Sequence, residues 1–259
     1  MMENENLNET TMTDDHKAVK HYHVWDRTVR VFHWINVLCV TALIGIGMVI
    51  LNSKSLDISN EGKILLKTIH VYVGYVLVLN LSWRFTWCFF GNRYSRWVSI
   101  LPFSKDYFTS LRSYIQGLKN NKAPDYLGHN PIGRLMVALL FFLLASQAIT
   151  GLILAGTDLY MPPFGHEISK WVGEDQDKLA LIKPYSTENI NAERYKNMRD
   201  FRKPIITLHY YIFYVILLSI VFHIAGVVIS ELRERSGLIS AMITGRKVFK
   251  NKPVDYEED

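Results

Sequence analysis

Two histidines lie fourteen residues apart in an otherwise apolar and aromatic stretch of the chain. They are His209 and His223, within Pro204–Ser230. On a straight helix this spacing gives about 1400° of rotation, within roughly 40° of complete turns, and about 21 Å of rise. Both imidazoles therefore face the same way at two heights. Ionisable side chains in such stretches are costly and usually face an interior or a cavity, so the pair predicts two stacked sites. The alternative is two histidines that only form hydrogen bonds between helices.

Four apolar runs are each long enough to cross a bilayer, because about 20 helical residues span its hydrocarbon layer of about 30 Å. The runs are Val31–Leu51, Ile64–Phe90, Leu135–Ala155 and Pro204–Ser230. The sequence thus predicts an all-α membrane protein, a bundle of four transmembrane helices within a domain of residues 21–247. Residues 1–20 are polar, with no apolar segment of a cleaved signal peptide, and predict a disordered tail. Residues 248–259 are expected to form a C-terminal tail.

The orientation of the bundle is predicted from the Lys and Arg residues in its connections. The N-terminal flank, the connection from Arg93 to Arg134 and the C-terminal segment from Arg233 are basic, whereas the connection Asn52–Lys63 has only two lysines. The longer connection Gly156–Lys203 balances eight basic against eight acidic residues. We therefore expect both termini in the cytoplasm and a multi-pass protein of a bacterial inner membrane. The sequence pI near 9.0 reflects these flanks, and no nucleic-acid-binding motif is present.

The alternating direction of the four runs places the histidines at matching depths. His70, near the outer start of the second run, shares a level with His209, and His33, near the inner end of the first run, shares a level with His223. Two opposed neutral imidazoles can supply both axial ligands of a haem iron while the porphyrin fills the space between helices. The spacing therefore predicts two stacked haems.

Other side chains have more local roles. Cys39 and Cys88 are the only cysteines and are expected to pack, and no motif for covalent haem attachment is present. Asp26 is expected to cap the first helix, and Asn130 or Pro131 is expected to begin the third. Three residues of the third run, Ser146, Gln147 and Thr150, are expected to form hydrogen bonds between helices. The segment after Glu231 has the pattern of an amphipathic end bound to the membrane surface, and His166 is expected to be exposed.

Several motifs carry a resemblance to a known family. They are Val29-Arg30-Val31-Phe32-His33-Trp34, Gly91-Asn92-Arg93-Tyr94-Ser95-Arg96, Gly128-His129-Asn130-Pro131 and the His209/His223 pair. From about Tyr22 to Lys247 the chain resembles the b-type cytochrome subunit of membrane-bound nickel–iron hydrogenases, within the bacterial cytochrome b561-like superfamily that includes the formate dehydrogenase gamma subunit. The segment Met161-Pro162-Pro163-Phe164-Gly165-His166 and the charged stretch after it look more like b-type cytochromes that serve other redox partners.

The resemblance implies two non-covalent haems b, an outer one held by His70 and His209 and an inner one held by His33 and His223. It also implies a quinone site beside the inner haem, which here points to Asn130. Electrons would cross between an extracytoplasmic partner, a hydrogenase or a c-type cytochrome, and the quinone pool. The chain would then be an electron-transfer subunit of an oxidoreductase complex, with no catalytic side chain of its own. Candidates for binding the haem propionates are the basic residues Arg30, Arg84 and Lys203; for Arg84 the alternative is a side chain that reaches the membrane surface.

Two other functions remain open at this point. A metal transporter would need acidic residues beside the histidines inside the spans, and the four runs contain none. A passive membrane anchor for a peripheral enzyme would use the histidines only in packing.

Overall fold

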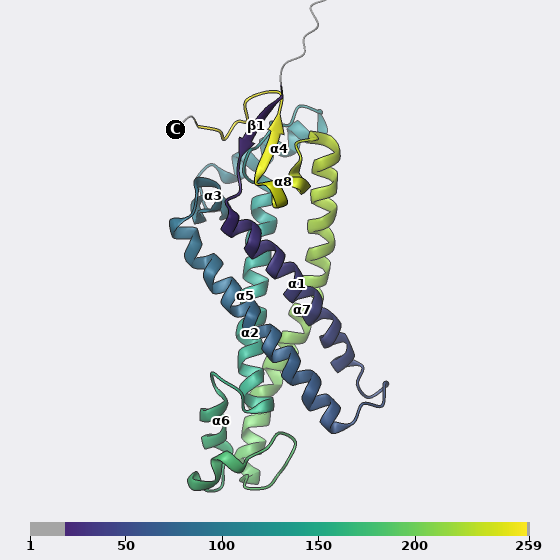
Figure 1. The fold of residues 1–259 in the computed structure, drawn as a ribbon, viewed down its shortest axis with the longest axis vertical. Helices are drawn as coiled ribbons and strands as arrows, with labels where there is room; N and C mark the ends of the chain where they lie inside the picture. The colour runs from purple at the N-terminus through teal and green to yellow at the C-terminus, as the bar shows by residue number, and fades with distance from the viewer. Residues whose placement is uncertain (1–18, 258–259) are drawn as a thin grey trace, which may run out of the picture.

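Four long helices form the body of the computed structural model, which describes residues 19–257 (Figure 1). The long helices are α1 (Arg27–Leu51), α2 (Asn60–Phe90), α5 (Pro131–Leu159) and α7 (Ala192–Glu234). Each is long and apolar enough to cross a membrane, so the predicted all-α bundle of four spans is confirmed. The shorter elements are β1 (Lys20–His23), η1 (Arg93–Ser95), α3 (Trp97–Ile100), α4 (Tyr107–Lys119), α6 (Gly165–Val172), η2 (Gln176–Leu181), α8 (Leu238–Thr244) and β2 (Arg246–Phe249).

The starts of α1 and α5 follow from local sequence signals. The Asp26 carboxylate accepts a hydrogen bond of 2.8 Å from the backbone N–H of Val29. The Asn130 side-chain oxygen accepts one of 2.7 Å from the N–H of Gly133, and Pro131 occupies the first helical position. Both caps satisfy a backbone donor that has no partner within the helix. The two predicted helix starts are therefore confirmed.

The long helices extend past the predicted apolar runs, and α7 does so most. It begins at Ala192 and not at Pro204, and its 43 residues correspond to about 64 Å at 1.5 Å per residue. Its first turns are rich in charge yet bury Met198 completely against α6 and neighbouring segments. Residues 192–203 were predicted to belong to a connection, and this is wrong: they are helical. Their packing on α6 stabilises the helix there. Pro204 lies inside the helix and provides no N–H for the preceding turn.

The core of the bundle lies between α1, α2, α5 and α7. Helices α1 and α2 pack together along much of their length, as do α5 and α7, and α2 also packs on α5. Buried side chains from all four helices and from α3 meet there: Phe32, Leu81, Cys88, Ile100, Phe141, Leu143, Leu144, Ile212 and Ile216. Cys39 and Cys88 are both buried and free, in agreement with their expected packing role.

Both described chain ends meet at one end of the bundle, which we call the terminal end (Figure 1). There β1 pairs antiparallel with β2, with Lys20 opposite Phe249. The expected boundary of a disordered tail at residue 20 is thus wrong for Lys20, and residues 1–18 lie outside the described part. The predicted binding of the C-terminal segment to the membrane surface stays a prediction. The segment folds back onto the bundle, and Lys247 within it is only 2% exposed.

The opposite end, which we call the loop end, contains the α1–α2 connection, α6 and η2 (Figure 1). A small apolar cluster formed by Ile168, Val172, Ile182 and Met198 holds α6 and the following loop onto the first turns of α7. This cluster explains why the long connection before the fourth span is structured.

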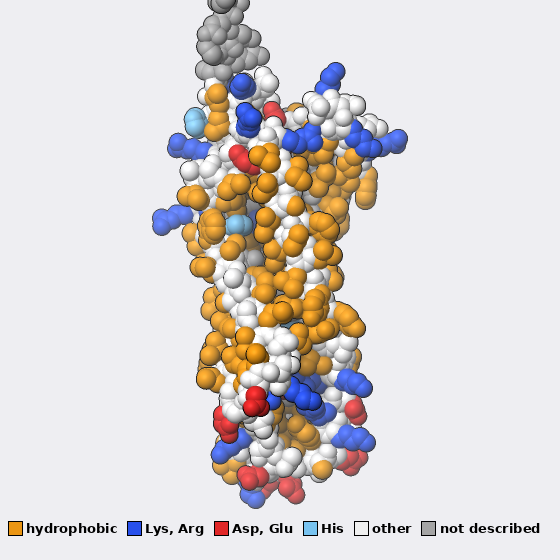
Figure 2. Space-filling model, turned by 90° about the vertical axis from the view of Figure 1, so that its right-hand side faces the viewer, with side chains coloured by type: hydrophobic (Ala, Val, Ile, Leu, Met, Phe, Trp, Pro, Cys, Tyr) orange, Lys and Arg blue, Asp and Glu red, His pale blue; other side chains and the backbone are white. Residues whose placement is uncertain are grey.

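Hydrophobic side chains cover the middle of the molecule, whereas most Lys, Arg, Asp and Glu side chains lie toward its two ends (Figure 2). Large apolar residues on the spans, such as Leu38, Leu79, Phe142 and Phe222, are exposed on the outside of the bundle. Such a band matches the hydrocarbon layer of a bilayer.

Candidate functional site

Toward the loop end, the bundle brings together His70 of α2 and His209 of α7. The two imidazoles lie close enough to interact electrostatically. The Nδ1 atom of His70 is buried and has no hydrogen-bond partner in the structure. Because a buried polar atom normally has a partner, this nitrogen is expected to serve a ligand or to gain one when a ligand binds.

The ring of His209 is held by two side chains of α5. Its Nδ1 lies 2.9 Å from the Thr150 hydroxyl, and its Nε2 lies 3.1 Å from the Gln147 side-chain nitrogen. The Thr150 hydroxyl donates its own proton toward the carbonyls of Ser146 and Gln147, so toward His209 it acts as acceptor. We therefore assign the proton of the neutral imidazole to Nδ1, which leaves Nε2 with the lone pair that a metal ligand needs. Of the three predicted interhelical hydrogen-bonding residues, Gln147 and Thr150 are confirmed, whereas Ser146 bonds within its own helix.

Toward the terminal end, His33 of α1 and His223 of α7 form the second pair. Both side chains are half-buried, and the two lie within electrostatic interaction range of each other. The Nδ1 of His33 is buried without a hydrogen-bond partner. The edge of the Trp34 ring system packs against His33, with 5.4 Å between ring centroids. The structure therefore groups the four histidines as the sequence predicts, and their coordination of iron stays a prediction.

Glycines lie next to the loop-end pair. A Cβ built on Gly47 of α1 would lie 3.5 Å from Cε1 of His70, and one built on Gly151 of α5 would lie 3.4 Å from Cε1 of His209. Gly74, four residues after His70, has open space where its Cβ would be. A flat macrocycle needs positions where the backbone of a helix can approach it closely, and space that no side chain fills. Paired imidazoles beside small residues, with Nδ1 of His70 unpartnered, therefore fit a haem ligated by two histidines.

An ion cluster that was not predicted from the sequence lies at the loop end of three helices and consists of Lys67, Asp158 and Arg202. The Lys67 ammonium and the Arg202 guanidinium both contact the Asp158 carboxylate, the latter at 3.0 Å. Lys67 also donates to the Tyr185 hydroxyl at 2.5 Å. The spacing of the two cations from His70 and His209 along their helices is the signal that could have found them.

The predicted propionate-binding residues have different surroundings. Arg30 lies one turn from His33, donates to the carbonyl of Ile243, and has a buried Nε without a partner. Arg84 is only 3% exposed, and its guanidinium donates to Cys88 Sγ at 2.8 Å and to the Ser95 carbonyl at 3.2 Å. Lys203 is exposed. Arg30 therefore suits the predicted role, Arg84 ties helix α2 to the segment that follows it, and Lys203 faces outward.

Asn130, the predicted quinone-site residue, also connects two parts of the terminal end. Besides capping α5, its side-chain nitrogen donates a hydrogen bond of 2.9 Å to the Tyr114 hydroxyl. That hydroxyl donates to Glu234 at the end of α7, at 3.4 Å. Burial, and then the nearby Glu234 carboxylate, raise the pKa of Tyr114, so the phenol stays protonated at neutral pH.

Two buried bases of the terminal end were not predicted. The ring of His129 packs on Trp25 with 4.7 Å between centroids, and its Nδ1 is buried without a partner. Burial, and then the nearby Lys247, lower the pKa of His129. The ammonium of Lys247 donates to the carbonyls of Tyr126 at 3.1 Å and Gly128 at 3.0 Å, and burial lowers the pKa of Lys247 to about 8.

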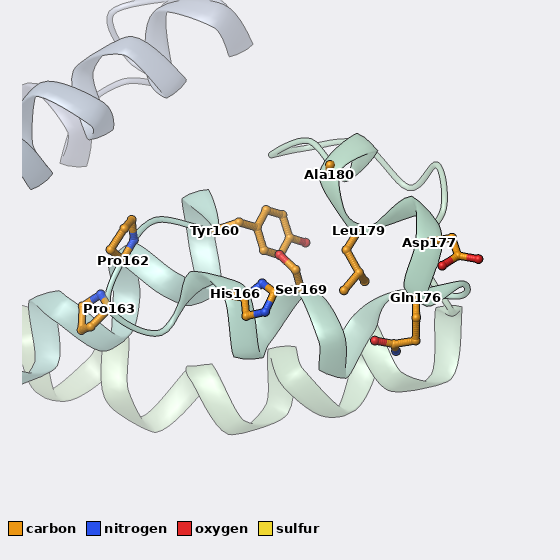
Figure 3. Close-up of a pocket in the computed structure, with 9 residues that line it drawn as sticks. All are labelled: Tyr160, Pro162, Pro163, His166, Ser169, Gln176, Asp177, Leu179 and Ala180. Carbon is orange, nitrogen blue, oxygen red and sulfur yellow. The ribbon is translucent and has the colours of Figure 1, made fainter.

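The loop end also contains an open hollow of about 520 Å³ between α6, η2 and the turn that joins α5 to α6 (Figure 3). The exposed imidazole of His166 lies in its wall, as do Tyr160 and Ser169, so the expected exposure of His166 is confirmed. Within residues 19–257 no group of three or more His, Cys, Asp and Glu side chains is arranged to hold a metal ion.

The four helices long and apolar enough to cross a membrane indicate a multi-pass membrane protein, and the grouping of four histidines in two pairs is compatible with the b-type cytochrome class. The chain belongs to the prokaryotic cytochrome b561 family, because the model of that family matches residues 24–245. A b-type haem and a role in electron transport follow from this membership. The match begins directly after β1 and ends directly after α8.

The curated relatives carry one common name, "Probable Ni/Fe-hydrogenase B-type cytochrome subunit". The protein from Rhizobium leguminosarum bv. viciae is 27% identical over 95% of this chain and 98% of its own length. The one from Cupriavidus necator is 22% identical over 91% of this chain and 90% of its own length. A further relative from Escherichia coli K12, named as the subunit of Ni/Fe-hydrogenase 1, is 34% identical over 53% of this chain and 61% of its own length. No solved structure matches the chain.

Proposed function

We propose that the chain is a di-haem cytochrome b that carries electrons across a bacterial inner membrane between an extracytoplasmic partner and the quinone pool. The arrangement of two imidazole pairs at two depths of one bundle carries this proposal. When bound, the two haems supply one-electron carriers. The chain supplies the ligands, their orientation and the low-polarity surroundings.

The loop-end pair has the more completely defined ligand geometry. Thr150 holds the proton of His209 on Nδ1, so that Nε2 faces the site with its lone pair, and the amide of Gln147 must turn aside when iron binds there. His70 approaches from α2, opposite His209. For the terminal-end pair, Arg30 offers a buried Nε one turn from His33. In ligating histidines the second nitrogen normally donates its proton to an acceptor, as Nδ1 of His209 does to Thr150, which fixes ring orientation and ligand basicity; the Arg30 guanidinium is a donor and suits a haem carboxylate instead.

The quinone is assigned to the terminal end, near Asn130. The hydrogen bonds from Asn130 to Tyr114 and from Tyr114 to Glu234 connect the start of α5 with the end of α7. These polar groups adjoin the half of the bundle that holds His33 and His223. The asymmetry of Lys and Arg residues supports a cytoplasmic position for this end and for both termini.

The loop end is then the side of the extracytoplasmic partner. The names of the relatives favour a Ni/Fe hydrogenase over a c-type cytochrome as that partner, and the similarity to the Rhizobium protein covers 95% of the chain, the segment after Met161 included. The surface formed by α6 and η2, with its hollow, is the structured candidate for contact (Figure 3). The chain acts as the electron-transfer subunit of such a complex.

The test is a dithionite-reduced minus oxidised visible spectrum of the purified protein, combined with a pyridine haemochrome assay of haem per chain. We expect two b-type haems in the wild type and one in His209→Leu, which removes a loop-end ligand. His166→Leu is the matched control, because this exposed imidazole lies at the same end outside the bundle, and it should keep both haems. A folded, colourless wild type, or an unchanged haem content in His209→Leu, would contradict the proposal.

A further inference from the structure

We propose that the ion cluster of Lys67, Asp158 and Arg202 is the propionate-binding head of the loop-end haem site. Lys67 and Arg202 would receive the two carboxylates of the haem, and Asp158 keeps these cations paired before the haem binds. The inference rests on the proposed di-haem function and deepens it, because it assigns to this site residues other than the exposed Lys203.

The charge of the cluster is unbalanced. Two cations share the single carboxylate of Asp158, and their side chains are mostly shielded, with 22% of Lys67 and 11% of Arg202 exposed. The Nε atom of Arg202 is buried and has no hydrogen-bond partner. A buried cation normally has a full set of acceptors because desolvation is costly. The cluster therefore has unused capacity for a second anion.

The cluster lies on the same helix faces as the loop-end histidines. Arg202 precedes His209 by seven residues, about 700° and 10.5 Å along α7, so it is two turns nearer the loop end on almost the same face. Asp158 follows Gly151, the glycine against His209, by the same interval on α5. Lys67 precedes His70 by three residues, about one turn. All three side chains thus line the loop-end side of the space between His70 and His209.

The chemistry of the ligand matches these groups. A b-type haem is apolar over most of its surface and bears two carboxylates on one edge. Guanidinium groups bind carboxylates through two parallel N–H donors, and an ammonium binds them as a compact charge. A haem between His70 and His209 with its carboxylate edge toward the loop end would place the anions at Lys67 and Arg202 and the apolar edge in the bundle.

The competing explanation is a purely structural ion cluster that ties α2, α5 and α7 together. The two explanations differ in the expected effect of Asp158. In a structural cluster, removal of the shared carboxylate is as disruptive as removal of Arg202, because both cations lose their partner. In a propionate-binding site, loss of Asp158 leaves both cations to the haem.

The experiment compares Arg202→Gln, Lys67→Gln and Asp158→Asn with Lys203→Gln, the matched control at the exposed neighbouring position. The readouts are haem per chain and the midpoint potential of each haem in a spectroelectrochemical titration. Loss of a nearby positive charge favours the ferric state. We expect Arg202→Gln and Lys67→Gln each to lower the potential of one haem by at least a tenfold change in its redox equilibrium, about 59 mV for one electron. Asp158→Asn should keep that haem and shift its potential upward, and Lys203→Gln should change neither haem.

Should Arg202→Gln lose the haem altogether, Arg202→Lys, which retains the charge, is expected to restore it. Equal loss of haem or of folded protein in Arg202→Gln, Arg202→Lys and Asp158→Asn would overturn the inference in favour of a structural cluster. Unchanged potentials in Arg202→Gln and Lys67→Gln would overturn it as well. The proposed function is tested separately by the haem content of the wild type. Fewer than two haems per wild-type chain would contradict the di-haem function before any variant is compared.

Discussion

Replacing Thr150 by Val is expected to weaken the loop-end haem site selectively. The change keeps the shape of the side chain but removes the hydroxyl that accepts from Nδ1 of His209 at 2.9 Å. A buried N–H left without an acceptor costs about 1–3 kcal/mol. Outer partners of metal-binding histidines typically contribute about 10–100-fold in affinity, which corresponds to about 1.4–2.7 kcal/mol. We therefore expect about 10–100-fold weaker binding of the loop-end haem in Thr150→Val.

The assay transfers haem from the oxidised purified protein to an excess of a haem-scavenging apoprotein and follows the visible spectrum to equilibrium. The terminal-end haem serves as the internal reference, because the hydroxyl of Thr150 bonds only within α5 and to His209 of the other pair. Thr150→Ser keeps the hydroxyl and should behave as the wild type. Ser146→Ala removes a hydroxyl that bonds only to the carbonyl of Phe142 in the same helix, and it should also have no effect. Equal loss of both haems in Thr150→Val, or no loss of either, would refute the assigned tautomer of His209.

Two further predictions concern packing and pH. Gly47→Phe should displace His70 and leave one haem per chain in the haemochrome assay, because even a Cβ at this position would lie 3.5 Å from the His70 ring. Gly45→Phe, at an exposed position, should keep both haems. Equal haem contents in the two variants would contradict this prediction. The pKa of Lys247 in the folded protein, about 8, lies below the pKa of a lysine in the unfolded chain. Between these two pKa values the unfolded state binds more protons than the folded state. The free energy of unfolding therefore rises with pH in this range, by at most about 3 kcal/mol. Lys247→Met should abolish this rise. Thermal denaturation in detergent at pH 7.5 and pH 9.5 measures the effect. The same change of stability with pH in the wild type and the variant would show that Lys247 is not its source.

The local signals in the sequence predicted the local structure. Asp26 and Asn130 each cap a helix with a side-chain oxygen that accepts from the backbone N–H three residues later. Such a cap depends only on neighbouring residues and needs no contact with a distant part of the chain. The grouping of the histidines in two pairs also follows from helix geometry, since 1.5 Å of rise per residue fixes height within a span. Membership of the cytochrome b561 family agrees with the bundle of four spans predicted from the apolar runs.

The ion cluster could not be predicted in the same way. Its members lie far apart in the sequence, with Lys67 and Asp158 separated by 91 positions. In addition, the apolar run of α7 begins at Pro204, so the sequence does not fix the helical phase of the residues before it. It therefore favours Lys203, whereas the structure exposes Lys203 and buries Arg202. Only packing of the first turns of α7 on α6 determines which of these two neighbouring cations faces the bundle.

Lys247 shows a different limit of sequence reasoning. A lysine in a charged terminal segment is normally exposed, and nothing in the neighbouring residues indicates otherwise. Its burial depends on two backbone carbonyls more than a hundred residues away and on the pairing of β2 with β1. Such positions become visible only when the whole fold is known.

The pairing of β1 with β2 also determines the order in which the protein can be completed during synthesis. Lys20 leaves the ribosome long before its partner Phe249, which follows 229 positions later. The contacts of Arg30 with Ile243 and of Trp34 with Met242 likewise form only after residues 242 and 243 have been synthesised. The helices can therefore enter the membrane and associate before the terminal end is closed. Until α8 and β2 fold back over the start of α1, His33 lies at an end of the bundle that is still open, which gives a nascent chain a period in which a large planar cofactor can enter.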